Sequence, residues 1–426
     1  MPARNIQILM VAAFICIGCY LQAKRYKYAA RISSAIETIE RNYVKPVTGE
    51  QLYESAMKGM LELDPYSEFI PPPEYVEFQA ALDQQFGGLG ILIEGPPNTK
   101  KLTVVTPLPK TPAYEAGIQP GDVITHINGK PTASFTSEQA REHMRGAVGT
   151  PVELTIERIG GLEPIDMKIV RADIQVDSVV GDHLNRDSSW NFFLAEEPRV
   201  AYVRVSLFGE RTTEEFRAAL RKIRPDARAL VIDLRFNPGG LMNAAVAMCD
   251  MLLEEGRIVS TKGRRSAFDS EVDADSRTEL STDIPIVVMT NDQSASAAEI
   301  MAACLQDRKR AYVAGERSFG KGTVQQVFEL QNDRTAIKIT IARYLRPNGK
   351  NIHRSPEMSA DDEWGVSPDP GYALKMTEVE QVYLFRRWQQ KGDPRRLFGD
   401  QPPQPECSGD SQLRLVLQEL RKQLDK

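Results

Sequence analysis

The chain has 426 residues, enough for about two to four domains, and 42% of them are hydrophobic while 26% are charged. That balance is typical of globular proteins and argues against a mostly disordered, fibrous or multi-span membrane protein. The formal net charge of −5 excludes binding of nucleic acid through bulk charge. Five cysteines, with no C-x-x-C pair beyond the first 20 residues, exclude a disulfide scaffold, and four scattered histidines leave little material for a metal site. We therefore expect neither a metal nor another cofactor.

Residues 1–25 are expected to form a signal anchor. An apolar run of about 18 residues, 6–23, is flanked by basic residues and is just long enough to span a bilayer. A cleaved signal peptide is the alternative, because both share an apolar stretch after a basic start. A lipoprotein leader cleaved before Cys19 is a third interpretation. In every version the bulk of the chain is exported, so we expect a protein of the cell envelope, inner-membrane-anchored or periplasmic.

Residues 26–85 are predicted to form an N-terminal helical arm. Within 29–61, Ile32, Ile36 and Ile39 recur at helical spacing, and three consecutive prolines in LDPYSEFIPPPEY (63–75) interrupt the helices. Such an arm packs on the core or joins two copies of the chain, so a homo-oligomer is one expectation.

Residues 86–172 change to short strands and glycine turns. The string FGGLGILI begins this stretch, and AYEAGIQPGDVITHINGKP follows at 113–131. Glycines before a strand leave backbone N–H groups free to hold a terminal carboxylate, and the strand offers an edge to a peptide. Together the strings resemble the PDZ domain in the circularly permuted form of bacterial proteases. The resemblance implies that Leu89, Gly90 and Ile91 form the carboxylate loop for the C-terminus of an unfolded or tagged polypeptide.

Residues 173–390 are predicted to be the α/β core. Between 199 and 345, apolar strands alternate with amphipathic helices, a pattern that favours a sheet of parallel strands. Residues 391–426 are read as a linker, rich in Pro and Gly as far as Asp410, and a C-terminal helix. The apolar face of that helix packs on the core or, alternatively, binds a partner helix.

Three strings in the core carry the residues of a hydrolytic site: LVIDLRFNPGGL (230–241), NDQSASAAEIMAACLQD (291–307) and GERSFGKGTVQQ (315–326). A serine hydroxyl is a weak nucleophile and needs a base. No histidine lies near these strings in the sequence. A lysine serves if burial lowers its pKa, and the glycines on both sides of Lys321 allow a close, dry fit. The pattern favours the serine–lysine variant of the catalytic triad.

The order of these motifs over residues 35–370 resembles the carboxyl-terminal processing, or tail-specific, peptidases, which are PDZ-containing serine–lysine endopeptidases. The resemblance implies an α/β catalytic core of the crotonase/ClpP-like β-α spiral type, with an inserted β-rich PDZ domain and the N-terminal helical arm. It assigns the nucleophile to Ser296, and the base to Lys321, which follows 25 residues later. It assigns Gln325 to the orientation of the lysine amine, and the backbone amides of Gly240 and Ala297 to the oxyanion hole.

Several residues keep alternative roles. Ser294 is either a turn residue or the nucleophile in place of Ser296. Glu299, in the first turn of a helix, is expected to complement the helix dipole rather than take part in catalysis. Arg145 faces solvent or couples the PDZ domain to the core. His353 is the fallback if lysine is not the base.

The sequence therefore predicts an exported or membrane-anchored serine endopeptidase that recognises polypeptide C-termini. A catalytically silent PDZ scaffold that only binds peptide ends is the alternative, disfavoured by the joint presence of serine, lysine and glutamine. An acyl-chemistry enzyme of the crotonase type is a third hypothesis, disfavoured by the PDZ strings. No nucleic acid partner is expected.

Overall fold

The computed structural model describes Met10, Ala13, Ile17 and residues 27–94, 101–275, 277–330, 335–359, 361–393 and 409–425. Among these residues no helix is both long enough and apolar enough to cross a bilayer. The expected anchor at 6–23 lies almost wholly outside the described residues, as does most of the linker before Asp410. The chain forms two compact units, residues 1–75 with 325–340 and residues 76–324 with 341–426.

The first unit contains two helices and part of a β-hairpin. Helix α2 spans Lys27–Asn42 and α3 spans Gly49–Met60, so the helical expectation for 29–61 is confirmed. Thr48 and Gln51 form a reciprocal capping box that begins α3. Strand β1 (Glu68–Ile70) pairs antiparallel with β21 (Thr335–Leu345), which also pairs with β20 (Thr323–Leu330).

Helix α4 spans Pro72–Asp83, and the second unit begins within it, at Val76. A small β module follows this helix. Its sheet has the order β3-β4-β5-β7-β8, with β6 beside β5. These strands are β3 Ile91–Glu94, β4 Leu102–Pro107, β5 Val123–Ile127, β6 Lys130–Pro131, β7 Pro151–Glu157 and β8 Ile165–Val170. Helices α5 (Pro112–Glu115) and α6 (Ser137–Met144) complete it. Strands β2 (Gln85–Gly88) and β9 (Ala172–Gln175) pair antiparallel, so the chain enters and leaves the module side by side, as an inserted domain requires.

The main sheet of this unit has the order β10-β14-β15-β18-β19, with β13 beside β14. Four of its strands are mutually parallel, as the alternation of strands and helices predicts: β14 Glu197–Val205, β15 Ala229–Asp233, β18 Ile286–Thr290 and β19 Ala311–Gly315. Two short strands, β10 (Val179–Val180) and β13 (Phe193–Leu194), pair antiparallel with β14.

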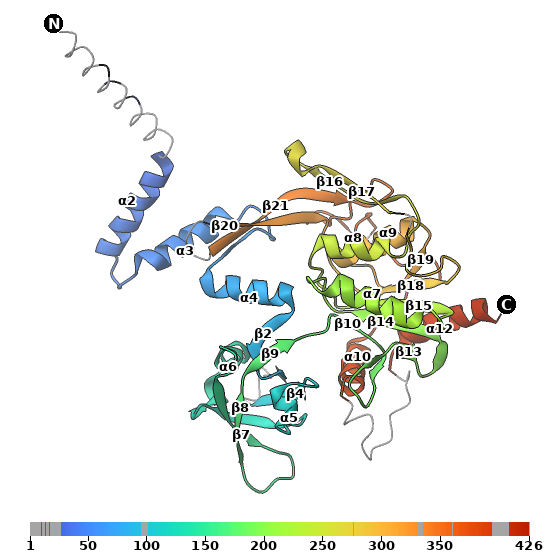
Figure 1. The fold of residues 1–426 in the computed structure, drawn as a ribbon. Coiled ribbons are helices and arrows are strands. Elements are labelled where there is room, and N and C mark those ends of the chain that lie inside the picture. The colour runs from blue at the N-terminus through green and yellow to red at the C-terminus, as the bar shows by residue number, and fades with distance from the viewer. Residues whose placement is uncertain are drawn as a thin grey trace. The chain divides into compact units, whose positions relative to one another are not determined.

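Helices cover both faces of the main sheet, which can be followed in Figure 1. Successive residues of β15 alternate between faces: Leu230 and Ile232 pack with α7 (Thr212–Ile223), α8 (Met242–Asp250) and α9 (Ala297–Asp307), while Ala229 and Val231 pack with α12 (Ser411–Leu424). Burial on both faces explains why these strands are continuous apolar runs.

The remaining elements lie around this layered core. They are β11 His183–Leu184, β12 Trp190–Asn191, β16 Arg257–Gly263, β17 Ser270–Asp273 and α10 Glu378–Lys391. The short 3₁₀ turns η1 and η2 span Thr132–Ser134 and Ser266–Phe268.

The C-terminal helix packs within its own chain, as its apolar face predicts. Its apolar residues Leu413, Val416, Leu417 and Leu420 are buried on the same face of the main sheet as Ala229 and Val231. At its far end Arg421 Nε donates to Glu197 Oε2 at 2.9 Å, and Arg199 Nε donates to Glu197 Oε1 at 2.7 Å. These contacts join α12 to β14.

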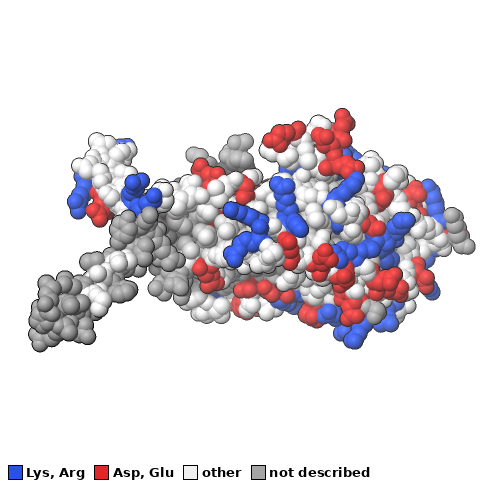
Figure 2. Space-filling model, turned by 90° about the horizontal axis from the view of Figure 1, so that it is seen from above, with Lys and Arg blue, Asp and Glu red and all other residues white. Residues whose placement is uncertain are grey.

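The surface drawn in Figure 2 mixes basic and acidic side chains instead of gathering one sign of charge. This mixture agrees with the small net charge of −5.

We predict that acid loosens the attachment of α12. The hydrogen bond from Arg199 holds the pKa of Glu197 at about 2, against the opposing effect of burial and with further help from Arg421. A carboxyl whose folded pKa is depressed stabilises the fold above its unfolded pKa of about 4.3, and this contribution is lost as the pH falls towards 2. Urea unfolding of wild type and Glu197→Gln should show a stability difference at pH 7 that shrinks between pH 4.5 and about 2. Glu419→Gln is the control, and a difference independent of pH would contradict the assignment.

Candidate active site

Three turns meet at the carboxyl ends of the parallel strands. They follow β14, β15 and β18 and contain Phe208, the Gly239–Gly240 pair and Ser296. Neighbouring parallel strands end at one edge of a sheet, which is where open α/β sheets carry their sites. The turns are bonded to one another, since Asn237 Nδ2 donates to Val205 O at 2.7 Å and Ala295 N donates to Asn237 O at 2.9 Å.

Ser296 occupies a sharp strand-to-helix turn directly before α9. Its backbone has φ +56° and ψ −115°, a conformation that a residue with a Cβ rarely adopts. Strain of this kind persists only when the surroundings enforce it, and it gathers at functional sites.

The glycine turn approaches Ser296 so closely that no side chain would fit. A Cβ on Gly239 would lie 2.7 Å from Ser296 Cβ, and a Cβ on Gly240 would lie 2.1 Å from Phe208 O. The amide of Gly239 donates to Asn237 Oδ1 at 2.8 Å. Among the described residues none accepts a hydrogen bond from the amides of Gly240 or Ala297, the two groups that the sequence assigns to an oxyanion hole.

Glu299 connects the serine turn to the lysine loop. Its fully buried carboxylate accepts from Ser296 N and Lys321 N, both at 2.8 Å, on one oxygen. The other oxygen accepts from Ser318 Oγ at 2.5 Å and from Gly320 N at 2.7 Å. Burial raises the pKa of this carboxyl, and the four donors oppose that effect. Because Ser318 Oγ already accepts from Val366 N, its proton points to Glu299, so every contact suits an ionised acceptor.

Tyr344 makes a second connection between the same two segments. Its hydroxyl, on a buried side chain, lies 3.3 Å from Ser296 O and makes a shorter contact with Lys321 O. Glu299 therefore holds the amides of Ser296 and Lys321, and Tyr344 holds their carbonyls.

The glycines beside Lys321 allow the close approach expected of them. Gly320 has φ +90°, and a Cβ on it would lie 2.8 Å from Arg354 Cβ. A Cβ on Gly322 would lie 2.5 Å from His353 N. The main chain of His353, which is remote in sequence, thus lies against the lysine loop.

Ser294 has a structural role in the turn. It is fully buried, its hydroxyl donates to Leu234 O at 2.8 Å, and it accepts from Asn291 N at 2.9 Å. These bonds favour Ser296 over Ser294 as the nucleophile.

Gln325 belongs to the first unit. Its Nε2 lies 3.2 Å from Thr340 Oγ1, which in turn lies 3.2 Å from Asp64 Oδ1 in the LDPYSEF segment. Its role in orienting the lysine amine stays a prediction.

The three PDZ loop residues lie at the start of β3, an end strand in the sheet order. Gly90 has φ +75°, and a Cβ there would lie 2.3 Å from Thr111 Cβ. Gly90 O accepts from Leu108 N at 2.8 Å, and the side chain of Leu89 is buried while Ile91 begins the strand. An end strand beside a glycine loop is the arrangement that strand addition by a peptide needs.

Arg145 has partners within the second unit. Its guanidinium pairs with Glu77 of α4 at 3.3 Å and lies 4.9 Å from the centre of the Phe86 ring. These contacts bridge the β module and α4, so Arg145 is not simply a solvent-facing charge.

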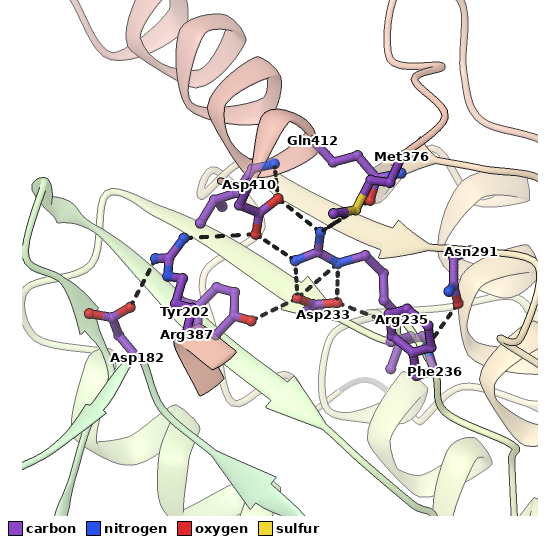
Figure 3. Close-up of polar contacts among 12 residues, drawn as sticks. Asp182, Tyr202, Asp233, Arg235, Phe236, Asn291, Met376, Arg387, Asp410 and Gln412 are labelled. Atoms are coloured by element: carbon purple, nitrogen blue, oxygen red, sulfur yellow. Dashed lines mark hydrogen bonds and ion pairs between the residues drawn. The ribbon is translucent and has the colours of Figure 1, made fainter. Parts of the chain in front are cut away.

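A buried ionic cluster surrounds Arg235, which lies in the sequence just before the glycine turn, as Figure 3 shows. Arg235 is fully buried and donates to Asp233, with the shortest distance 2.6 Å, and to both oxygens of Asp410 at 2.9 Å. Phe236 N, the next residue of the turn, donates to Asn291 Oδ1 at 2.8 Å. The start of the C-terminal helix is thereby bonded to the turn that carries Gly240.

Comparisons with known proteins identify the family of the chain. Residues 199–370 match peptidase family S41, residues 103–158 match a PDZ domain and residues 20–71 match the activating protease CtpB N-terminal domain. A carboxy-terminal-processing protease of Bartonella bacilliformis is 37% identical over 337 residues, which are 77% of this chain and 73% of that protein. The carboxy-terminal processing protease CtpA of Bacillus subtilis is 30% identical over 337 residues, 78% of this chain and 68% of that protein.

Among solved structures, a Bacteroides fragilis protein assigned to the S41 proteases is similar in fold. It has a TM-score of 0.52 and 17% identity, covering 91% of this chain and 97% of that one. The fold and the matched regions define a serine-type peptidase with a PDZ domain. The chain belongs to the carboxy-terminal processing proteases of peptidase family S41.

Sequence reasoning missed Glu299 and Tyr344 as positioning residues. Glu299 was expected only to complement the helix dipole, and its spacing of three from Ser296 is the capping-box signal that pointed to their contact. Nothing in the local sequence marks Tyr344, which reaches the site from β21.

We predict that Glu299→Gln loses activity and stability together. In glutamine an NH₂ group replaces one of the two acceptor oxygens. Two of the four groups that donate to Glu299 would then face another donor and lose their acceptor. Each unpaired buried donor costs about 1–3 kcal/mol. Chemical unfolding should show that loss, and kcat on a peptide reporter should fall more than KM rises. Glu378→Gln, at an exposed first-turn glutamate of α10, is the matched control. Wild-type kcat in the Glu299 variant would contradict the positioning role.

Proposed function

We propose that this protein is an exported serine endopeptidase in which Ser296 is the nucleophile and Lys321 the general base. The observation that carries the proposal is the double connection of these two residues: Glu299 accepts from both amides, and Tyr344 contacts both carbonyls. That connection lies at the carboxyl edge of the parallel sheet, beside a glycine turn with available amides.

In the proposed reaction, Ser296 Oγ attacks the scissile carbonyl while the neutral amine of Lys321 takes its proton. The amides of Gly240 and Ala297 bind the oxyanion of the tetrahedral intermediate. Lys321 then gives the proton to the leaving amine, and the acyl-enzyme forms. Water, deprotonated by the same amine, releases the acyl group and regenerates the serine. Gln325 orients the lysine amine.

The PDZ module is proposed to bind the C-terminus of an unfolded or tagged polypeptide through Leu89, Gly90 and Ile91. The end-strand position of β3 and the positive φ of Gly90 support this assignment. We further propose the crotonase/ClpP-like β-α spiral for the core and export with anchoring through residues 1–25. The apolar run at 6–23 supports export.

The experiment that tests the proposal is casein cleavage by the purified protein, which a catalytically silent PDZ scaffold would not perform. Ser296→Ala should abolish cleavage and leave folding intact, because it removes one hydroxyl from a turn held by other groups. Ser294→Ala should instead lower stability, since its hydroxyl bonds within the turn. Wild-type turnover by Ser296→Ala, measured on casein, would reassign the nucleophile.

Lys321→Arg should lose about 10³-fold or more in kcat/KM although its charge is kept, because arginine does not deprotonate in proteins. Gln325→Ala should be milder, about 5- to 150-fold, since it removes one orienting hydrogen bond. The wild-type profile of kcat/KM against pH should rise as the amine loses its proton. Substantial activity of Lys321→Arg with an unchanged profile would point to another base, and His353→Ala would then be measured.

A further inference from the structure

A cavity of about 720 Å³ lies within the second unit, between the β module and the main sheet. Its volume is in the range of sites that bind peptides or drug-sized molecules. Its lining includes four aromatic side chains, Trp190, Phe236, Phe385 and Trp388, and two arginines, Arg204 near the end of β14 and Arg235. The ring of Phe236 lies 4.6 Å from that of Phe385 and 6.0 Å from that of Trp388.

The cavity adjoins the proposed catalytic turns. Phe236 lies three residues before Gly239, the glycine at which an added side chain would collide with Ser296. Ser206, on the cavity wall, lies two residues before Phe208, against which Gly240 packs. A peptide with its scissile carbonyl at Gly240 would therefore place residues only a few positions away, at about 3.3 Å per residue, beside the cavity.

Arg204 is a cation without a bonded acceptor in this cavity. Among the residues that the structure describes, none accepts a hydrogen bond from its guanidinium or forms an ion pair with it. Its Cζ lies 4.2 Å from the centre of the Trp388 ring. Burial lowers the pKa of this guanidinium, yet arginine stays protonated at any physiological pH.

The carboxylate closest to Arg204 in strand register, that of Asp233, already accepts hydrogen bonds from other residues. Asp233 lies opposite Arg204 in the register of the two parallel strands. Its oxygens, however, accept hydrogen bonds from Arg235 and, at 2.7 Å, from the Tyr202 hydroxyl. Arg235 is satisfied by two carboxylates, Asp233 and Asp410, as Figure 3 shows. Of the two arginines that line the cavity beside Trp388, Arg235 is thus bonded to two carboxylates, while Arg204 is bonded to no described carboxylate and is attracted by Asp233 only at longer range.

The other charged groups of the lining lie at exposed positions. Asp173 accepts from Gln85 Nε2, and Asp177 accepts from Trp190 Nε1 at 3.0 Å. Lys110 is an exposed second cation. A positive charge beside four aromatic side chains suits an anion attached to an apolar stem, and the guanidinium fork matches a carboxylate.

We propose that Arg204 binds a carboxylate of the polypeptide substrate, so that the protease prefers substrates with a carboxylate a few residues from the scissile bond. This proposal rests on the proposed function and concerns a site distinct from the Gly90 loop. The carboxylate comes from the substrate's C-terminus or from an aspartate or glutamate side chain, and the aromatic walls hold the adjoining apolar atoms.

The test uses internally quenched ten-residue peptides and the full-length protein. One pair ends in a free carboxylate or an amide. A second series is amidated and carries one glutamate, or one glutamine, at successive positions. Wild type should cleave at least one carboxylate peptide about 10- to 100-fold better in kcat/KM than its amide counterpart. In Arg204→Gln that ratio should fall to about one, with partial recovery in Arg204→Lys.

The ratio separates recognition from structure, because a purely structural defect lowers cleavage of both members of a pair equally. Lys110→Gln is the control for general positive charge and should keep the wild-type ratio. The pair that responds identifies the terminal or the side-chain carboxylate as the ligand. An unchanged ratio in Arg204→Gln, or no preference in wild type, would overturn the proposal.

Failure of the proposed catalysis is distinguished by binding. Fluorescein-labelled versions of the same peptides are titrated into Ser296→Ala protein, with and without Arg204→Gln, and followed by anisotropy. If wild type cleaves no peptide but binding keeps the carboxylate preference and loses it in the Arg204 variant, the proposed function fails and the subsite stands. Equal binding of carboxylate and amide peptides refutes the subsite.

Discussion

The carboxylate of Glu299 is the contact from which the geometry of the candidate site follows. A charge this deeply buried is unfavourable unless donors replace the water it has lost. Four donors do so here, two of them the amides of Ser296 and Lys321. Because all four must converge on two oxygens, the serine turn and the lysine loop have little freedom to separate. The strained φ of Ser296 is held by the same contact, since its amide is one of the donors.

The layered sheet brings these segments together in the first place. Its parallel strands end at one edge, so turns that are distant in sequence become neighbours without long excursions of the chain. Helices on both faces keep that edge rigid by burying the strands completely. The C-terminal helix belongs to this support, because Asp410 at its start bonds Arg235 next to the glycine turn. The buried carboxylates of the site thus hold segments in position: Glu299 has four donors, and Asp233 and Asp410 share Arg235.

Arg204 and Arg235 show how the same residue type acquires different roles at neighbouring strand ends. Both lie close to Trp388, at 4.2 and 5.8 Å from its ring centre. Arg235 takes both available carboxylates and becomes structural. Arg204 is bonded to no described carboxylate, and it is the residue that we propose binds a carboxylate of the substrate.

The sequence by itself determined the parallel strands and helices of the core, and it indicated the three segments that form the candidate site. Periodicity and apolar runs indicate which face of an element is buried. The short strings SAS (294–296), FGKG (319–322) and NPGG (237–240) can be recognised locally, because each consists of adjacent residues. What only the tertiary structure decided are relations between distant side chains. The sequence leaves Ser294 as an alternative to Ser296, and only the structure shows that the Ser294 hydroxyl is buried and bonded to Leu234 O. The partnership of Arg235 with Asp410 spans 175 residues, and that of Tyr344 with Ser296 spans 48. No local pattern encodes such pairings, because they arise from how the packed layers bring strand ends and helix starts to the same place.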